Sequence, residues 1–225
     1  MELIQPESLV VWDLHGVMEK GNEGAVLEIT NRVLREHSQS RQMTSDENEA
    51  FYGLRWIEYF QRLTPHATHL HEHMQAEAFR ISQDQPEIIA RHLQPNDYLH
   101  EVLAAIEQND SQIVISNTQP RSLDVYLTAL GITRFFPPGA AFALDRHSDA
   151  NQKKSAILSK FLEDKRFKKI ILAGDSPADI ALKNYVPGTP TKTYLYSHPN
   201  RPFRECEADH KIHDLRVIVQ NEIYR

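Results

Sequence analysis

The chain has very little cysteine. Cys206 is the single one, so no disulfide can form within the chain, which is typical of proteins in a reducing compartment. No apolar run approaches the ~20 residues that a membrane-spanning helix needs. The first residues, MELIQPES, have neither the basic start nor the apolar stretch of a signal peptide. We therefore expect a cytoplasmic protein with no membrane partner.

The chain also lacks an excess of positive charge. Lys and Arg number 25 against 31 Asp and Glu, which gives a net charge of −6. A nucleic-acid surface needs clustered Lys and Arg, so this balance argues against a nucleic-acid partner. Internal repeats and low-complexity linkers are missing as well, and no feature of the sequence sets the oligomeric state. A length of 225 residues with 40% apolar residues instead indicates a globular chain with a large core.

Five short apolar runs are predicted to form the buried strands of one sheet. They are unbroken rather than alternating, which is typical of parallel strands covered on both faces. Helical patterns lie between most of them, so we expect an α/β fold with a doubly wound parallel sheet. The runs span residues 8–14, 111–116, 140–144, 168–174 and 192–196.

The interval between the first two strands is too long for one crossover. Its helical patterns predict an inserted α-helical cap. "TSDE" at 44–47 resembles a capping box formed by Thr44 and Glu47, and Asn96 is expected to cap the helix that follows Pro95. We place the core at 1–19 and 93–225 and the cap at 20–92. Cap helices are expected at 23–37, 66–82 and 86–93, with an aromatic-rich helix between the first two.

The aromatic-rich helix would carry Tyr52, Trp56, Tyr59 and Phe60. Such residues are typical of the core of a small helical unit. The alternative is that part of this face closes over a substrate, as lids do, with Arg55 meeting a second anionic group.

The histidines of "HATHLHEHM", residues 66–74, invite comparison with a zinc site. His69 and His73 are four residues apart and would share a helix face. The segment has no HExxH pattern, however, so a polar surface of the cap is the preferred interpretation.

Polar residues follow three of the predicted strands. Asp13 ends the first strand, Ser116 the second and Asp175 the fourth, while Lys153 and Lys154 begin the helix before that fourth strand. In an open α/β sheet, ligands bind beyond the carboxyl ends of the strands. Each residue alone has an ordinary explanation, because Asp and Ser cap helices and form turns and paired lysines are usually solvated. Together they predict a site.

The chemistry of this set fits a phosphorylated ligand. Two carboxylates with a backbone carbonyl and waters make an oxygen site of the kind that Mg²⁺ accepts. A lysine beside the metal would neutralise a phosphate, and Ser116 with nearby backbone N–H groups would hold its oxygens. Asp13 could then attack phosphorus and form an aspartyl-phosphate.

The order of these residues resembles the four motifs of the haloacid dehalogenase superfamily. "GDSPADI", in which Asp179 lies four residues after Asp175, is the most specific piece, and the similarity runs from residue 8 to near 218, where "ADHKIHDLRVI" resembles the last strand and helix. The insert resembles the helical cap of one major subclass. The resemblance implies a Mg²⁺-dependent hydrolase acting on a small phosphorylated metabolite.

The resemblance also implies a role for each residue. Asp13 would be the nucleophile and a metal ligand, and the carbonyl of His15 and the carboxylate of Asp175 would complete the metal site, supported by Asp179. The phosphoryl group would be held by Ser116, Asn117 and one of the paired lysines, of which we prefer Lys154 over Lys153.

The first motif departs from the family pattern. Phosphatases of this superfamily usually read Asp-x-Asp, and the second aspartate protonates the leaving group and then activates water. This chain reads Asp13-Leu14-His15. Three interpretations follow. His15 is itself the general acid and base, for which an imidazole is suited near neutral pH. Alternatively, the chain is another hydrolase of the superfamily, acting on phosphonates or haloacids, or it is a catalytically weak protein that binds a phosphorylated ligand.

Overall fold

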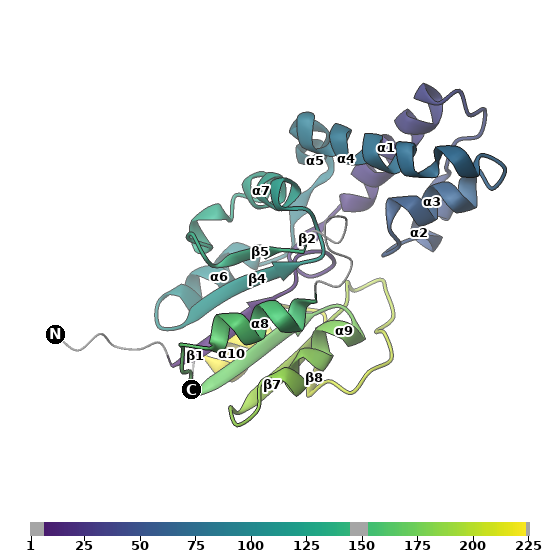
Figure 1. Ribbon diagram of the computed structural model, residues 1–225. Coiled ribbons are helices and arrows are strands. Elements are labelled where there is room, and N and C mark those ends of the chain that lie inside the picture. Colours follow the sequence, from purple (N-terminus) through teal and green to yellow (C-terminus); the bar gives the residue numbers. More distant parts are fainter. Residues whose placement is uncertain (1–6, 145–152, 224–225) are drawn as a thin grey trace. The chain divides into compact units, whose positions relative to one another are not determined.

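The computed structural model describes residues 7–144 and 153–223 (Figure 1). The chain forms two compact units: Met1–Glu19 together with Pro95–Arg225, and Lys20–Gln94. We call them the sheet unit and the helical unit. The chain passes between them at two very short strands, β2 (Glu19–Lys20) and β3 (Gln94–Pro95), which pair with each other.

The sheet unit is built on six parallel strands in the described part of the chain, in the order β5-β4-β1-β6-β7-β8. This confirms the predicted α/β fold with a doubly wound parallel sheet. The central strand β1 is buried at every position, as an apolar strand covered on both faces must be. The strands are β1 (Ser8–Trp12), β4 (Ser111–Ser116), β5 (Ala141–Ala143), β6 (Lys169–Gly174), β7 (Thr191–Tyr196) and β8 (His210–Ile212).

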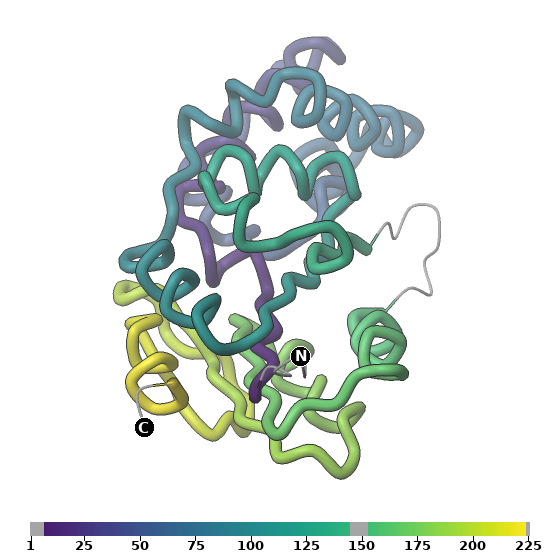
Figure 2. The backbone as a smooth tube through the Cα atoms, turned by 90° about the vertical axis from the view of Figure 1, so that its left-hand side faces the viewer, coloured from purple at the N-terminus to yellow at the C-terminus, as the bar shows by residue number. Residues whose placement is uncertain are grey.

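Helices cover both faces of this sheet. Figure 2 shows α6 and α10 on one side of the strands and α8 on the other. Helix α6 packs against α10, α8 packs against the short helix η3, and α9 packs against β6 and β7. The helices are α6 (Leu99–Glu107), α7 (Pro120–Ala129), η2 (Thr133–Phe135), α8 (Lys154–Leu162), α9 (Pro177–Ile180), η3 (Ala181–Tyr185) and α10 (Arg216–Glu222).

The register of the three central strands determines where a site can form. Trp12 at the end of β1 lies opposite Val114 of β4 on one side and Ala173 of β6 on the other. The residues that follow these positions therefore leave the sheet at the same edge, where ligands bind in folds of this type.

The helical unit is built of helices, as the sequence predicted for the interval between the first two strands. Helix α1 packs against α2, α4 and α5, and α3 packs against α4. The predicted capping box is confirmed, because Thr44 Oγ1 accepts from the Glu47 N–H at 3.2 Å and Glu47 accepts from the Thr44 N–H at 3.0 Å. The helices are α1 (Asn22–Glu36), α2 (Ser45–Ala50), α3 (Trp56–Leu63), η1 (Thr68–Leu70), α4 (His71–Asp84) and α5 (Pro86–His92).

The prediction of one aromatic-rich helix from Tyr52 to Phe60 was wrong. Gly53 adopts a positive φ of 87° and separates α2 from α3, so Tyr52 lies in the turn. Such a φ suits glycine and interrupts a helix. Arg55 is the N-cap residue of α3 and pairs with Glu58 at 3.0 Å, not with a neighbour on a longer helix.

Two further helix starts differ from the prediction. The helix expected from residue 66 begins at His71, after the short helix η1. The N-cap residue of α6 is Tyr98, with a φ of 61°, and not Asn96. The Asn96 amide is used elsewhere: it donates to the carbonyl of Val17 at 2.8 Å. None of the helices in residues 7–144 and 153–223 combines the length and the apolar character that a membrane span requires.

Candidate active site

Asp13 leaves the sheet directly after β1. Its N–H donates to the carbonyl of Ala173 at 2.9 Å, which extends the pairing with β6 by one residue. Its Oδ1 accepts from the N–H of Leu14 at 2.8 Å. These bonds fix both the backbone and the carboxylate of Asp13 at the edge of the sheet.

Lys154 joins two of the predicted acidic residues. Its Nζ lies 2.7 Å from Asp13 Oδ1 and 2.7 Å from Asp179 Oδ1. Lys154 is 7% exposed, whereas Lys153, the N-cap residue of α8, is exposed. Of the two lysines, the structure therefore places Lys154 among the acidic residues. It contacts Asp13 although the two residues are 141 positions apart in the sequence.

The turn from β6 into α9 holds Asp179. Its Oδ2 accepts from the backbone N–H of Ser176 at 3.2 Å and from Ser176 Oγ at 2.5 Å, in a capping box. A Cβ added to Gly174 would stand 2.1 Å from Asp179 Cβ, so only glycine permits this close approach. Both oxygens of Asp179 are thus engaged by the protein itself.

Burial and neighbouring charges shift the pKa values of Asp13, Asp175 and Lys154. Burial raises the pKa of Asp13 to about 7, with the negative charges of Asp179 and Asp175 acting in the same direction and Lys154 opposing them. Burial also raises the pKa of Asp175, opposed by Arg204, Lys154 and His15. Burial alone would lower the pKa of Lys154, but the attraction of Asp13 and Asp179 outweighs it and raises that pKa. Lys154 therefore stays charged.

Ser116 ends β4, the strand next to β1. It is fully buried, and its Oγ has no hydrogen-bond partner among the described residues. Burying a hydroxyl without a hydrogen-bond partner costs folding free energy. A ligand that bonds to this hydroxyl would supply the missing partner. Asn117, the next residue, is exposed.

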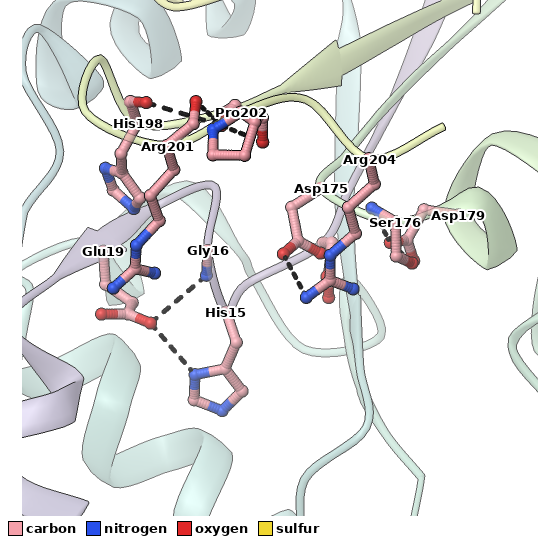
Figure 3. A network of polar contacts seen from close by, with 12 residues as sticks. His15, Gly16, Glu19, Asp175, Ser176, Asp179, His198, Arg201, Pro202 and Arg204 are labelled. Atoms are coloured by element: carbon pink, nitrogen blue, oxygen red, sulfur yellow. Dashed lines mark hydrogen bonds and ion pairs between the residues drawn. The ribbon is translucent and has the colours of Figure 1, made fainter. Parts of the chain in front are cut away.

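His15 lies in the loop that follows Asp13. Its Nδ1 is 3.4 Å from Oε1 of Glu19, and the same oxygen accepts from the N–H of Gly16 at 3.3 Å (Figure 3). The ring also contacts Tyr126 edge to face, with 4.6 Å between the ring centroids. Two neighbours thus define the position of the imidazole.

Arg204 approaches the site from the loop between β7 and β8. Its Nη2 is 3.6 Å from Oδ2 of Asp175, and Figure 3 shows the two side chains facing each other. The Arg204 side chain is 43% exposed, so a solvent-accessible positive charge stands beside a mostly buried carboxylate.

The acidic residues meet the requirements of a divalent cation site. One carboxylate oxygen each from Asp13, Asp175 and Asp179 lies within 4.8 Å of the others. Hard oxygen donors of this kind suit Mg²⁺. The group is the only cluster of three or more His, Cys, Asp or Glu with metal-binding spacing in residues 7–144 and 153–223, so the histidines at 66–73 form none. His71 is buried and bonds the carbonyl of Thr64 at 2.9 Å, while the other three histidines are exposed.

Two polar residues of the site were not predicted. Glu19 could have been suspected, because it is a carboxylate four residues after His15 in an otherwise apolar stretch. Arg204 carries no such signal, since it lies in an irregular loop 29 positions after Asp175 (204 − 175).

The chain is similar to one family of known proteins in sequence and to many solved structures in fold. The profile of the family described as haloacid dehalogenase-like hydrolases matches residues 10–183. No curated protein matches the chain. Many solved structures share the fold.

Three of these structures illustrate the likeness. A haloacid dehalogenase superfamily hydrolase of subfamily IA from Geobacter sulfurreducens has a TM-score of 0.72 at 18% identity, with 96% of each chain covered. CbbY from Rhodobacter sphaeroides, in complex with phosphate, has a TM-score of 0.66 at 14% identity, covering 95% of this chain and 96% of its own. A haloacid dehalogenase family hydrolase from Deinococcus radiodurans, with bound phosphate and sodium, has a TM-score of 0.63 at 14% identity, covering 97% and 95%.

Proposed function

Because this chain belongs to the haloacid dehalogenase-like hydrolases, we propose that it is a Mg²⁺-dependent phosphatase of a small phosphorylated metabolite. The observation that carries the proposal is the buried Lys154 ammonium between the carboxylates of Asp13 and Asp179. Phosphate complexes of CbbY and of the Deinococcus radiodurans hydrolase, which share the fold, support a phosphate ligand.

Asp13 is the proposed nucleophile. The hydrogen bonds that the structure gives this carboxylate, among the described residues, all go to Oδ1, which leaves Oδ2 to attack phosphorus. A bond forms between Oδ2 and phosphorus, and the bond from phosphorus to the ester oxygen breaks. The product is an aspartyl-phosphate on Asp13, which water then hydrolyses by attack at phosphorus.

Lys154 and Ser116 are proposed to hold the phosphoryl group. A lysine ammonium carries three N–H donors, and two of those of Lys154 are used by Asp13 and Asp179. The third remains for a phosphoryl oxygen. The buried Oγ of Ser116, at the end of the neighbouring strand, would gain in this oxygen the partner that it lacks. Asn117 is proposed to assist at the exposed rim.

Mg²⁺ is proposed to bind to the carboxylates of Asp13 and Asp175 and to the backbone carbonyl of His15. When bound, it supplies positive charge that favours the ionised form of Asp13 and balances the phosphate. Asp179 is assigned a supporting place, because its two oxygens already bind Lys154 and Ser176.

His15 is proposed to act as the general acid and base in place of the usual second aspartate. It would protonate the departing ester oxygen and then accept a proton from the attacking water. The helical unit is proposed to be the cap that selects the substrate.

One screen tests the proposal. Phosphate esters, phosphonates and haloacids are supplied to the intact chain and to Asp13→Asn, each with Mg²⁺ and with a chelator. We expect hydrolysis of phosphate esters that needs Mg²⁺ and is lost in Asp13→Asn. Activity toward haloacids that survives the chelator would contradict the proposal and favour a haloacid hydrolase. Phosphate binding without turnover of any ester would contradict it and favour a protein that only binds a phosphorylated ligand.

A further inference from the structure

Glu19 is a buried acidic residue outside the residues assigned to the reaction so far. It is 2% exposed and follows the buried residues Val17 and Met18 at the end of the loop after β1. Glutamate is almost never fully buried unless it is paired. The partners that the structure gives it here include the His15 imidazole and the Gly16 N–H, and Figure 3 places it in a polar network that also contains Arg201.

The contact with His15 assigns the two ring nitrogens. Carboxylate oxygens accept hydrogen bonds, so the 3.4 Å contact between His15 Nδ1 and Glu19 Oε1 favours the tautomer with its hydrogen on Nδ1. The other nitrogen, Nε2, is then the one that can exchange a proton with a ligand. Figure 3 shows Nδ1 turned toward the glutamate and the second nitrogen on the opposite edge of the ring. Carboxylates fix the tautomer of histidines in this way in other sites.

Two further contacts restrain the ring. Glu19 Oε1 also accepts from the Gly16 N–H at 3.3 Å, which holds the carboxylate against the turn. Tyr126, itself buried on α7, meets the imidazole at an interplanar angle of 86°. The imidazole is therefore held by a carboxylate through one nitrogen and by an edge-to-face contact with an aromatic ring.

We infer that Glu19 is a positioning residue for His15, and that the pair does together what one aspartate at position 15 would do. The inference rests on the proposed function, since it assigns Glu19 to the acid–base step of that reaction. Glu19 holds the Nδ1–H tautomer and the ring orientation, and Nε2 passes a proton to the departing ester oxygen. The carboxylate that the first motif lacks at position 15 is thus present four residues later, and it acts through an imidazole.

The kinetic test is a double-mutant cycle on the intact chain with p-nitrophenyl phosphate and Mg²⁺. Glu19→Gln keeps the size of the side chain and an oxygen that can accept from Gly16. We expect kcat to fall about tenfold or more with KM changed by less than about twofold. This is comparable to the loss, about 10–100-fold, that follows removal of a partner that orients a metal-bound histidine. Glu205→Gln, which removes the same charge from an exposed position, should leave kcat unchanged.

The cycle distinguishes positioning from a merely structural role. In the His15→Ala background, Glu19→Gln should cause no further loss of kcat, because the ring on which Glu19 acts is absent. If Glu19 only stabilises the loop, its substitution slows the His15→Ala protein by the same factor as the parent. That multiplicative result would overturn the inference.

A spectroscopic measurement tests the same inference without turnover. The ¹⁵N chemical shifts of the His15 ring, assigned as the signals lost in His15→Ala, should report one Nδ1–H tautomer in the parent and in Glu205→Gln. They should move toward averaged values in Glu19→Gln. Unchanged shifts in Glu19→Gln contradict the inference, even for a protein that hydrolyses phosphate esters. A chain that shows the expected shifts but no hydrolysis would refute the proposed function and leave the positioning intact.

Discussion

At the scale of single residues, the site depends on one buried cation, Lys154, and three carboxylates that lie close together. Lys154 neutralises part of the negative charge, and burial keeps the interaction strong because water does not screen it. Removing one member of such a group is costly, since the partners remain buried and charged. The two residue-scale predictions concern Lys154 and Asp13.

The paired lysines provide a matched comparison. Lys154→Met removes the ammonium that contacts Asp13 and Asp179, and we expect kcat/KM for phosphate esters to fall about 100-fold or more, the size of a lost transition-state contact in a dry site. Lys153→Met changes the same charge one residue earlier, at an exposed position, and should change kcat/KM by less than about twofold. Equal effects of the two substitutions on kcat/KM would contradict a role for Lys154 in the reaction.

Asp13 predicts a pH dependence of stability in the presence of a chelator. Its pKa rises from 3.8 to about 7 on folding, so the folded protein retains a proton that the unfolded chain releases. This group therefore lowers the free energy of unfolding as pH rises from about 4 to about 7. Asp13→Asn has no carboxyl group that titrates, so the free energy of unfolding of the variant minus that of the parent should rise across this range and level off above it. Urea unfolding at several pH values measures the difference, and a constant difference contradicts the assigned pKa.

The residues of the site were predictable from sequence where a motif carries them, and not elsewhere. Asp13, Ser116 and Asp175 each follow an apolar run, which places them at strand ends. Glu19 needs the folded loop to bring it back to His15, and Arg204 needs an irregular connection to reach Asp175. Such contacts depend on how loops pack in the folded chain. Loops have no regular spacing of apolar residues from which these contacts could be predicted.

At the scale of elements, the corner between β6 and α9 controls the acidic cluster. Gly174, Ser176 and Asp179 form it, and the capping box fixes the Asp179 carboxylate toward Lys154. The strands of the sheet were predictable because parallel strands covered on both faces are uninterrupted apolar runs. The break between α2 and α3 was not, because the aromatic residues keep a helical spacing across Gly53 although its φ of 87° ends the helix.

The β6–α9 corner gives an element-scale prediction. Gly174→Ala would place a Cβ 2.1 Å from Asp179 Cβ and push the carboxylate away from Lys154. We expect a loss of about 1–3 kcal/mol in the free energy of unfolding, typical of overpacking, together with weaker Mg²⁺ binding. Urea unfolding and calorimetric titration with Mg²⁺ measure the two effects. Parent-like values of both would show that the corner tolerates displacement of Asp179.

At the scale of the whole molecule, the residues assigned to the proposed reaction lie outside the inserted helical unit. All six strands of the main sheet and every residue assigned to the reaction lie in the sheet unit. The helical unit has its own internal packing among α1 to α5. Its two connections, β2 and β3, pair with each other, so the ends left by its removal are adjacent.

This division predicts that the sheet unit folds alone. A chain in which a short Gly-Ser linker replaces residues 20–94 should unfold cooperatively and still bind Mg²⁺, because its strands and acidic cluster are retained. Circular dichroism during urea unfolding and calorimetric titration with Mg²⁺ test this. Non-cooperative unfolding would show that the helical unit is needed for the fold of the sheet unit.

The most direct test of the central claim is to trap the covalent intermediate. The intact chain is mixed with p-nitrophenyl phosphate and Mg²⁺, quenched in acid within one turnover, and reduced with borohydride, which converts an aspartyl-phosphate to homoserine. Mass spectrometry should find homoserine at position 13 and at no other aspartate, and Asp13→Asn should show none. Hydrolysis by the parent with no conversion at position 13, or hydrolysis by Asp13→Asn at the parent rate, would contradict the account.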